Sequence, residues 1–503
     1  MELKKTNVHH YEVVMDETVS MDQGAEMIVP DSYPDIAHIV DTSGVACLKD
    51  KALYADRLEL NGLCKAGVLY TPEGETGLRK IDVNVPFTRT FDGAMESSPV
   101  AVANVRVLQA DARMINPRKV QVSVTMLIEV KVYSRKTLEL TDEVVGPPGE
   151  SSCEVLKNAE NAWLLTSIQN KPVTLNEEIE IPTSRAAIDE ILKADVRLVP
   201  GEMKIIGAKV VFKGLATVRL LYTAMGRPYS VEQEYPFSQI IEIDGAEEGA
   251  NLEAALQLAG LDIDFLPGGD ARKLAVVLYV DVTVLAFADM RIETVSDVYG
   301  IGASIKPDIK ALGLKAIDER TSRRQSVRES IDVGDEVGEV IDSSVVIGPV
   351  ISHDGKTGCD CTVKVVYHTE GGRYENTSRS MHVPCPAEEA IPGELSAQLS
   401  GEVVASPTAG GIEVRFGVDF DMVHVRECKL LSVVNVTEEP EEPKQDTGKI
   451  CNVILRRCRK GESLWDIAKR FGSTRAELAH CNKLETIDDA PEGKVLLIPR
   501  KRC

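Results

Sequence analysis

The chain has 503 residues, which is too long for a single hydrophobic core and should divide into about three or four domains. Apolar residues make up 43% of it and charged residues 27%, a composition that argues against wholesale disorder and against membrane embedding. The formal net charge of -22 argues against a general nucleic-acid or anionic-membrane binder, because a phosphate partner would be repelled at long range.

The first residues of the chain do not have the apolar core of a signal peptide, because Glu12, Asp16 and Glu17 interrupt every candidate run. The longest apolar stretch starts at Leu274, but Asp281 breaks it and it is too short to cross a bilayer. Eleven cysteines, an odd number spread thinly, fit reduced thiols better than a disulfide framework. We therefore expect a cytoplasmic protein without a membrane span.

Three similar hexapeptides, LYTPEG, LYTAMG and VYHTEG, begin at residues 69, 221 and 366 and indicate an internal repeat. The first two copies align without a gap, and the matched pairs are 152 residues apart: Pro30 with Pro182, Ile36 with Ile188, Ile39 with Ile191, Gly62 with Gly214, Tyr70 with Tyr222, and Gly74 with Gly226. A repeat of this length predicts duplicated domains rather than a solenoid. The third copy keeps the later part of the pattern but not its opening, which indicates a diverged or truncated domain.

Each of the first two copies opens with a proline followed by apolar residues at helical intervals, which predicts a short helix over 30–40 and over 182–192. Alternating apolar residues predict strands in the rest of each copy, with a hairpin at the hexapeptide. The charged segment 308–330 is compatible with a helix or a connector. The predicted fold class is mainly β, with two or three tandem sandwich-like domains that each open with a short helix, followed by a small C-terminal domain.

Residues 437–448, TEEPEEPKQDTG, combine prolines with acidic residues and predict an extended tether. From Gly448 onward, thirteen Lys and Arg stand against seven Asp and Glu, so this tail carries a net charge of +6 and the remainder -28. The predicted division is a strand or extension at 1–29, β-rich domains at 30–150, 151–300 and 301–436, a linker at 437–448, and a terminal domain at 449–503.

The terminal domain has a βααβ pattern, with strands near 451–458 and 494–499 and helices near 463–471 and 474–481. One helix carries a continuous apolar stripe, formed by Leu464, Ile467, Ala468 and Phe471. Capping boxes are predicted at both helices, from Ser463 with Asp466 and from Thr474 with Glu477. Trp465 and Phe471 are expected to be core residues rather than platforms for a sugar ring.

This segment resembles the LysM domain. The residues GESLWDIA at 461–468, Asn482-Lys483-Leu484, and GKVLLIP at 493–499 match its motifs, although Glu462 replaces the usual Asp and Glu492 separates the usual Pro-Gly pair. The resemblance implies a groove for N-acetylglucosamine-containing glycans between the loops 461–464 and 489–493. The groove or partner-binding residues that it implies are Gly461, Glu462, Ser463, Leu464, Asn482, Leu484, Asp489, Ala490, Pro491, Glu492 and Gly493. For Ser463, helix capping is favoured over ligand contact.

The body supports a second resemblance. The segments VPDSYPDIAHIV at 29–40 and LELNGLCKAGVLYTPEG at 58–74, with their counterparts at 181–192 and 208–226, are similar to the SPOCS domain of sporulation proteins. SPOCS repeats followed by a LysM domain are the arrangement of the SipL-like spore coat morphogenetic proteins. That resemblance implies docking of the LysM-like tail on a SpoIVA-like coat basement ATPase, on the mother-cell side of the forespore surface.

The sequence contains no convincing catalytic motif. GIGASI at 300–305 lacks the third glycine of a dinucleotide-binding loop, and the carboxylates do not show the spacing of a catalytic pair. One cluster has the elements of a zinc site, namely His353, Cys359, Cys361, His368, His382 and Cys385. Because Cys359 and Cys361 are two residues apart on a predicted strand, they share one face without the tight knuckle of a C-x-x-C motif. Buried or edge thiols are therefore favoured over a metal, and no cofactor is expected.

The favoured hypothesis is a non-enzymatic scaffold that links coat proteins to the forespore surface, with the basic terminal domain recruited to a SpoIVA-like partner and other coat proteins as further partners. The alternative is a protein that binds peptidoglycan or its lipid-linked precursor through the LysM-like groove. A cell-wall enzyme is a distant third reading, because it would need a catalytic domain that the sequence does not offer.

Overall fold

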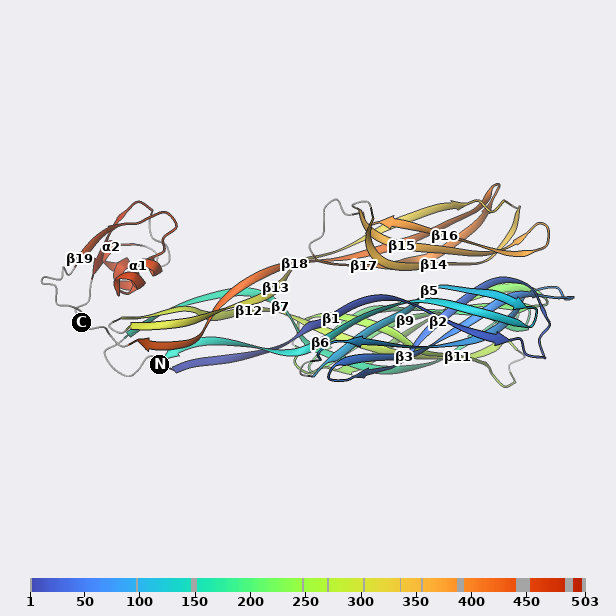
Figure 1. Cartoon of the computed structure of the whole chain (residues 1–503), viewed down its shortest axis with the longest axis horizontal. Coiled ribbons are helices and arrows are strands. Elements are labelled where there is room, and N and C mark those ends of the chain that lie inside the picture. The colour runs from blue at the N-terminus through green and yellow to red at the C-terminus, as the bar shows by residue number, and fades with distance from the viewer. Residues whose placement is uncertain are drawn as a thin grey trace.

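The computed structural model of the chain describes residues 2–95, 98–145, 152–246, 248–268, 271–301, 304–334, 336–353, 356–386, 393–439, 453–484 and 492–499. Within these ranges the chain forms twenty strands and two helices, so the mainly β prediction is confirmed. The molecule is elongated, with a wide body at one end, a narrow stalk, and a small module beside the tip of the stalk (Figure 1). In the part of the chain that the structure describes, neither helix is long and apolar enough to cross a membrane.

The body and stalk are built from three successive units of six strands. The first contains β1 (Glu2–Ile28), β2 (Ile36–Leu53), β3 (Arg57–Pro72), β4 (Arg79–Asp92), β5 (Val100–Asn116) and β6 (Lys119–Val145). The second contains β7 (Ser152–Glu180), β8 (Glu190–Ile206), β9 (Lys209–Ala224), β10 (Arg227–Glu242), β11 (Asn251–Phe265) and β12 (Lys273–Ile301). The third contains β13 (Ser304–Ile331), β14 (Val337–His353), β15 (Lys356–Thr369), β16 (Tyr374–Pro384), β17 (Gly393–Thr408) and β18 (Gly411–Glu439).

The three units have one topology. In each, the second, third and fourth strands form one antiparallel sheet, while the first and fifth strands flank the sixth in another. A separate hydrophobic core lies between the two sheets of each unit. The third unit therefore has diverged in sequence but is not truncated. The strand β1 pairs with β6 along nearly its whole length, so residues 1–29 belong to the first unit rather than preceding it.

The short helices predicted at 30–40 and 182–192 are wrong. Residues 30–35 form a turn, in which the amide of Tyr33 donates to the carbonyl of Pro30, and β2 begins at Ile36. The equivalent turn at Pro182 precedes β8. The strand β2 has irregularities in its pairing next to Ile36 and Ile39, and each extra residue shifts the alternation. Two bulges thus give a strand the three- and four-residue spacing that is typical of a helix.

The charged segment 308–330 is also neither a helix nor a connector, because it forms most of β13 and pairs with β18 throughout. The start of the predicted linker is strand as well: Thr437, Glu438 and Glu439 end β18 and pair with the beginning of β13. The remainder of that linker, 440–448, lies outside the described residues. Pairing with a partner strand, which local sequence does not reveal, decides the structure of these polar segments.

The stalk consists of the first and last strands of each unit, which are 27 to 29 residues long, whereas the other strands of the units have 11 to 18. Beyond the body, these strands continue as three two-stranded ribbons packed side by side (Figure 1). Their apolar contacts come from all three units, for example Leu140, Ile292 and Leu430. The buried hydroxyl group of Thr294 lies 2.8 Å from that of Ser432 and donates to the carbonyl of Thr141, so these three residues form a polar contact between the units inside the stalk.

In the body, the three units meet through equivalent residues. The second strand of each unit has a β-bulge at the same place, and the bulged residue is apolar: Val40, Leu192 and Ile341. One apolar residue from the third strand of each unit packs with them: Leu69, Leu221 and Val366. These six side chains form a small core that the three units share. A bulge re-aims a side chain out of its sheet. The bulge repeated in each unit therefore directs one side chain toward the other two units.

The residue after each bulge is charged and joins an ion-pair network at this junction. Lys193 binds Asp342 at 2.8 Å, and Arg219 binds the same carboxylate at 3.0 Å. The side chains of Lys193 and Asp342 are only 9% and 5% exposed. Asp41 pairs with Lys364 at 2.6 Å. Because each of these pairs joins two different units, the network fixes how the units are arranged.

The terminal module contains β19 (Val453–Arg457), α1 (Leu464–Phe471), α2 (Arg475–Asn482) and β20 (Val495–Pro499), so the βααβ prediction is confirmed. The two strands form an antiparallel pair. The core is made of buried side chains from both helices and β20, including Leu464, Ile467, Leu478, Leu496 and Ile498, and the partly buried Ile454 of β19 packs against it.

Candidate functional site

Both helices of the terminal module begin with the predicted capping boxes. The amide of Asp466 donates to the hydroxyl of Ser463 at 3.1 Å, and the amide of Ser463 donates back to the carboxylate of Asp466 at 3.2 Å. Thr474 and Glu477 make the same reciprocal pair at α2. The Ser463 hydroxyl also donates to Asp466 at 2.7 Å. The donor and one acceptor site of this hydroxyl are therefore used in starting α1.

Glu462, which stands where the LysM motif usually has Asp, is part of the loop's own structure. Its carboxylate pairs with the guanidinium of Arg456 and accepts a 3.2 Å hydrogen bond from the amide of Arg459. The side chains of Glu462 and Arg456 are only 16% and 15% exposed. The longer side chain of Glu462 thus reaches back to β19 and ties the loop to that strand.

Asn482 connects the end of α2 to β20. Its amide nitrogen donates to the carbonyls of Leu478 and Leu497 at 2.8 and 2.7 Å, and its oxygen accepts from the amide of Leu497 at 2.7 Å. Leu484 packs against the module core, and Leu464 is completely buried within it. These three positions therefore hold the module together.

The described end of the second groove loop contacts the end of β19, which leads into the first groove loop. The amide of Gly493 donates to the carbonyl of Cys458 at 3.2 Å, and Arg457 donates to the carbonyl of Gly493 at 3.1 Å. Gly461 and Gly493 have φ values of 75° and 74°, which glycine adopts without strain. Both glycines are exposed, as is Glu492. The predicted groove residues Asp489, Ala490 and Pro491 lie outside the described residues.

The module does not stand apart from the body, because α1 contacts the tip of the β7–β12 ribbon. The indole of Trp465 packs edge-on against the ring of Tyr299, with 4.8 Å between ring centroids, and its Nε1 donates to Asp297 at 2.8 Å. Lys469 binds the same carboxylate at 2.6 Å. The hydroxyl of Tyr299 donates to the carbonyl of Ser473 at 2.7 Å. Burial raises the pKa of Tyr299 above its ordinary value, so the phenol remains a donor.

A second contact joins α2 to the same ribbon. The guanidinium of Arg475 lies 3.6 Å from the carboxylate of Glu154 and donates to the carbonyl of Val155 at 3.3 Å. Two cations of the basic module, Lys469 and Arg475, thus bind acids of the stalk. The sequence offers no sign of Asp297, Tyr299 or Glu154 as contact residues, because they lie more than 160 residues before the module residues that they contact.

The family model named SipL, SPOCS domain, matches residues 187–266, and the LysM domain model matches residues 458–499. The chain combines a SPOCS domain with a C-terminal LysM domain. This is the architecture predicted from the sequence. No curated protein and no solved structure gives a significant match.

The matched SPOCS segment begins just before β8 and ends just after β11, in the second unit. It therefore includes the three-stranded sheet and one strand of the opposite sheet, whereas the long strands β7 and β12 lie outside it. The LysM match includes both helices and β20, and it begins immediately after β19. The residues that clamp the LysM domain to the stalk, Asp297 and Tyr299, belong to neither match.

Two cysteines of the predicted cluster, Cys359 and Cys361, are part of the hydrophobic core of the third unit. Cys359 and Cys361 are completely buried on one face of β15, as their spacing predicts, with their sulfur atoms 3.6 Å apart. The hydrogen bond to Cys359, together with burial, raises the pKa of the Cys361 thiol. Within the described ranges, no group of three or more His, Cys, Asp or Glu side chains could hold a metal ion.

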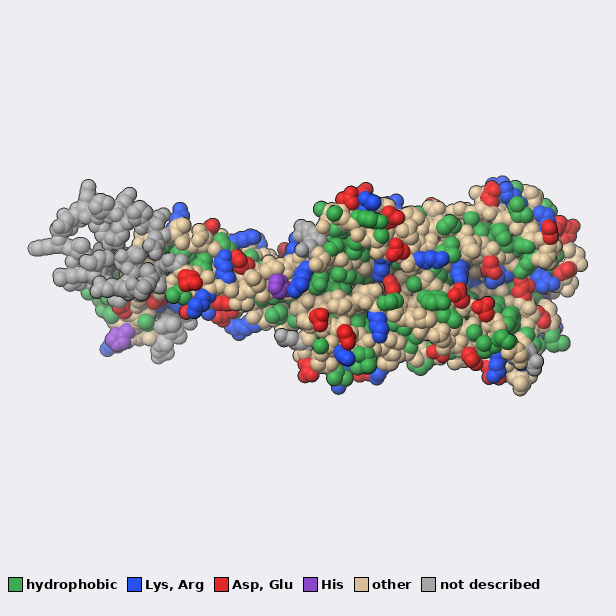
Figure 2. Space-filling view, turned by 90° about the horizontal axis from the view of Figure 1, so that it is seen from below, with side chains coloured by type: hydrophobic (Ala, Val, Ile, Leu, Met, Phe, Trp, Pro, Cys, Tyr) green, Lys and Arg blue, Asp and Glu red, His purple; other side chains and the backbone are tan. Residues whose placement is uncertain are grey.

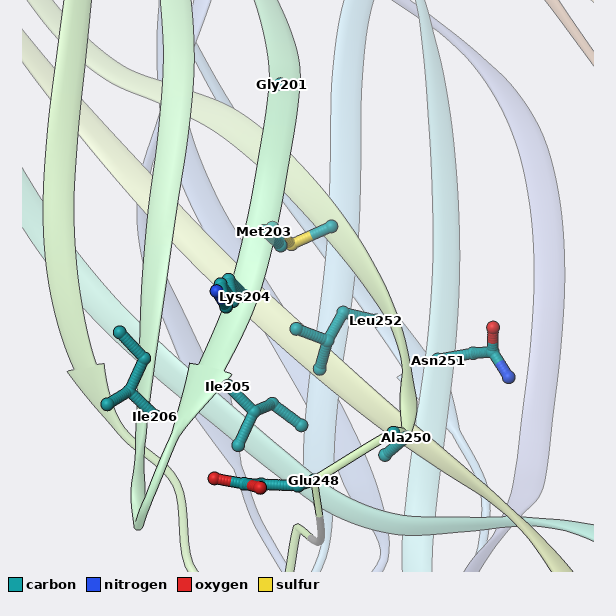
Figure 3. Close-up of a pocket in the computed structure, with 10 residues that line it drawn as sticks. Gly201, Met203, Lys204, Ile205, Ile206, Glu248, Ala250, Asn251 and Leu252 are labelled. Atoms are coloured by element: carbon teal, nitrogen blue, oxygen red, sulfur yellow. The ribbon is translucent and has the colours of Figure 1, made fainter.

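A cavity of about 860 Å³ opens in the second unit between the end of β8 and the start of β11 (Figure 3). It is lined by backbone and by aliphatic side chains such as Ile205 and Leu252; among the described lining residues, Lys204 and Glu248 are the charged ones. Such a lining is suited mainly to apolar contact.

Proposed function

We propose that this protein is a non-enzymatic scaffold of spore coat assembly, in which three SPOCS-like units form one rigid body and the LysM domain docks on a coat basement protein, a SpoIVA-like ATPase. The combination of a SPOCS domain with a LysM domain fits a sporulation-related scaffold or a peptidoglycan-binding role. We place the protein on the mother-cell side of the forespore surface, with other coat proteins as partners of the body and domain boundaries near 150, 300 and 436.

The protein-binding proposal rests on the hydrogen bonds and ion pairs that the polar groove residues make within the module. The side chains of Glu462, Ser463 and Asn482 bind other groups of the module. Sugar recognition needs polar groups directed at the ligand hydroxyls, and these three are already paired within the fold. Besides Lys469, which binds Asp297, six cations in the described part of the module are exposed: Arg457, Arg459, Lys460, Arg470, Lys483 and Lys494. An acidic protein surface would complement them.

The remainder of the chain supports a linking role. The long strands hold the LysM domain at the far end of the stalk from the three-unit body (Figure 1). On the face shown in Figure 2, acidic and basic side chains are interspersed rather than separated by sign. Two separate binding regions at the ends of an elongated molecule would let one contact raise the effective concentration of the other.

The test is binding of the full-length chain to the purified basement ATPase, compared with a chain that ends before residue 449. We expect saturable binding of the full-length chain and its loss on truncation, and a fluorescent fusion should form a ring around the forespore. Equal binding by both chains, or a diffuse fusion signal, would contradict the proposal.

A second candidate function is binding of peptidoglycan or its lipid-linked precursor. It is favoured by the exposed backbone of Gly461 and Gly493 and by the exposed carboxylate of Glu492, which lie at the two loops where LysM domains bind glycans. Titration of muropeptides or chitin oligomers into the full-length chain separates the two functions. Saturable chemical-shift changes at Ser463 and Glu492 would favour the glycan.

A further inference from the structure

The outer face of the two-stranded sheet of the LysM domain is apolar and exposed. Strand residues alternate between faces, so Val453 and Leu455 on β19 and Val495 and Leu497 on β20 point away from the helices. Their exposed fractions are 50%, 68%, 54% and 43%, respectively. Leu455 lies directly opposite Leu497 in the strand register. We call these four residues the outer strip.

The outer strip is distinct from the module core and from the contact with the stalk. The alternate residues Leu496 and Ile498 point inward and are completely buried. The contacts with the stalk come from Trp465, Lys469 and the segment 473–475, which belong to the helices and the turn between them. Because the helical side of the module faces the stalk tip, docking leaves the sheet side available to another molecule.

Cations border one end of the outer strip. Arg457 is the register partner of Val495, and Lys494 precedes that valine; both cations are exposed. An exposed acid, Glu492, lies two residues before Lys494. Arg457 is held in place because its Nε donates to the carbonyl of Gly493 at 3.1 Å. An ordered guanidinium beside aliphatic side chains presents a site for a carboxylate next to a site for apolar groups.

We propose that the outer strip is the surface through which the LysM domain binds its protein partner, and that the partner contributes an apolar segment flanked by carboxylates. This inference rests on the proposed function and identifies the face of the LysM domain that performs it. Four neighbouring aliphatic side chains left in water favour association, because each loses contact with water when a partner covers it. The Arg457 end of the strip sets the orientation through charge complementarity.

The test uses the full-length chain with the substitutions Leu455→Ser and Leu497→Ser, singly and together, and the basement ATPase as the probe. Each single substitution should weaken binding about tenfold, because each removes a leucine that becomes buried in the complex. Arg457→Glu should weaken binding and reduce its dependence on salt. The matched control is Ile240→Ser on β10, an aliphatic residue of the body that is 57% exposed. All substituted positions are exposed, so circular dichroism should show unchanged folding.

Loss of binding in the leucine variants, with the control unaffected, would support the inference. Undiminished binding in the double variant would overturn the inference while leaving the proposed function intact. Failure of the unmodified chain to bind would overturn both. If sedimentation shows that the unmodified chain self-associates and that the double variant does not, the strip binds a second copy of this chain and the acidic partner is wrong.

Discussion

The indole nitrogen of Trp465 lies 2.8 Å from a carboxylate oxygen of Asp297, although 168 residues separate the two in sequence. Lys469, one helical turn after Trp465, binds the same carboxylate. A single acid at the stalk tip thus holds two neighbouring side chains of α1. The LysM domain is therefore presented in one orientation, with its helices against the stalk.

Replacing Asp297 with Ala should release the LysM domain from the stalk. The change removes a hydrogen bond and an ion pair to a carboxylate that is only 17% exposed, so we expect the docked state to lose about 2 kcal/mol, or about thirtyfold in population. Acrylamide quenching of Trp465 in a Trp163→Phe background, with small-angle scattering, measures the release. The control is Glu293→Ala, which breaks an exposed ion pair with Lys157 on the same ribbon. Equal quenching in both variants would contradict the role of Asp297.

Replacing Asp342 with Asn should destabilise the junction of the three units. The substitution leaves the buried ammonium of Lys193 without its 2.8 Å partner, and breaking a buried pair costs about 3–5 kcal/mol. Asp195 also binds Lys193, at 3.0 Å, but is 41% exposed, so Asp195→Asn should cost less than about 1 kcal/mol. Thermal unfolding of both variants measures the difference. Similar melting temperatures for the two would show that the network contributes no specific stability.

The same ion-pair network predicts that the stability of the protein depends on pH. Burial opposes ionisation of Asp342, but the charges of Lys193 and Arg219 outweigh it and lower the pKa of Asp342 below its usual value. A carboxyl with a lowered folded-state pKa contributes stability above its unfolded pKa of about 3.9, and that contribution is lost as the pH falls through the folded value. The melting temperature should therefore drop below about pH 4, and less steeply in Asp342→Asn. If the melting temperatures of the unmodified chain and of Asp342→Asn fell equally with pH, Asp342 would not be the group responsible.

Gly62 should not tolerate even a methyl group. A Cβ at this position would lie 2.2 Å from Cζ of Phe87 and 2.6 Å from the carbonyl oxygen of Cys47, because the Phe87 ring covers the glycine from the neighbouring strand. Gly62→Ala should lower stability by about 1–3 kcal/mol through overpacking. Gly67→Ala, on the same strand, meets its nearest atom at 3.5 Å and serves as the control. Chemical denaturation compares the two, and equal midpoints would refute the steric argument.

Ser463→Ala should weaken α1 without abolishing partner binding. Loss of the cap costs about 1 kcal/mol, because the amide of Asp466 loses its acceptor. Hydrogen exchange of the α1 amides in the full-length chain should become faster, and Ser463→Asp, which retains a capping oxygen, should restore it. A much larger loss of binding than of helix protection would instead indicate that Ser463 contacts the ligand directly.

The local features of the LysM domain could be predicted because neighbouring residues determine them. Ser463 and Thr474 start helices through groups three residues away, and the apolar stripe of α1 follows from its period. The repeat could be predicted as well, since Gly62 and Gly214 occupy equivalent positions under equivalent phenylalanines. The structure of the openings at 30–40 and 182–192 could not be predicted from the sequence. A strand with bulges can have the apolar spacing of a helix, and only the pairing with its partner strand distinguishes the two.

The amino-acid sequence by itself determined the β class, the repetition and the βααβ module, since alternation, helical period and capping residues act over a few positions. Only the tertiary structure decided that the three units join through Val40, Leu192 and Ile341, and that Asp297 receives Trp465. These contacts join residues more than 140 positions apart. Their free energy depends on burial and pairing that no local pattern encodes.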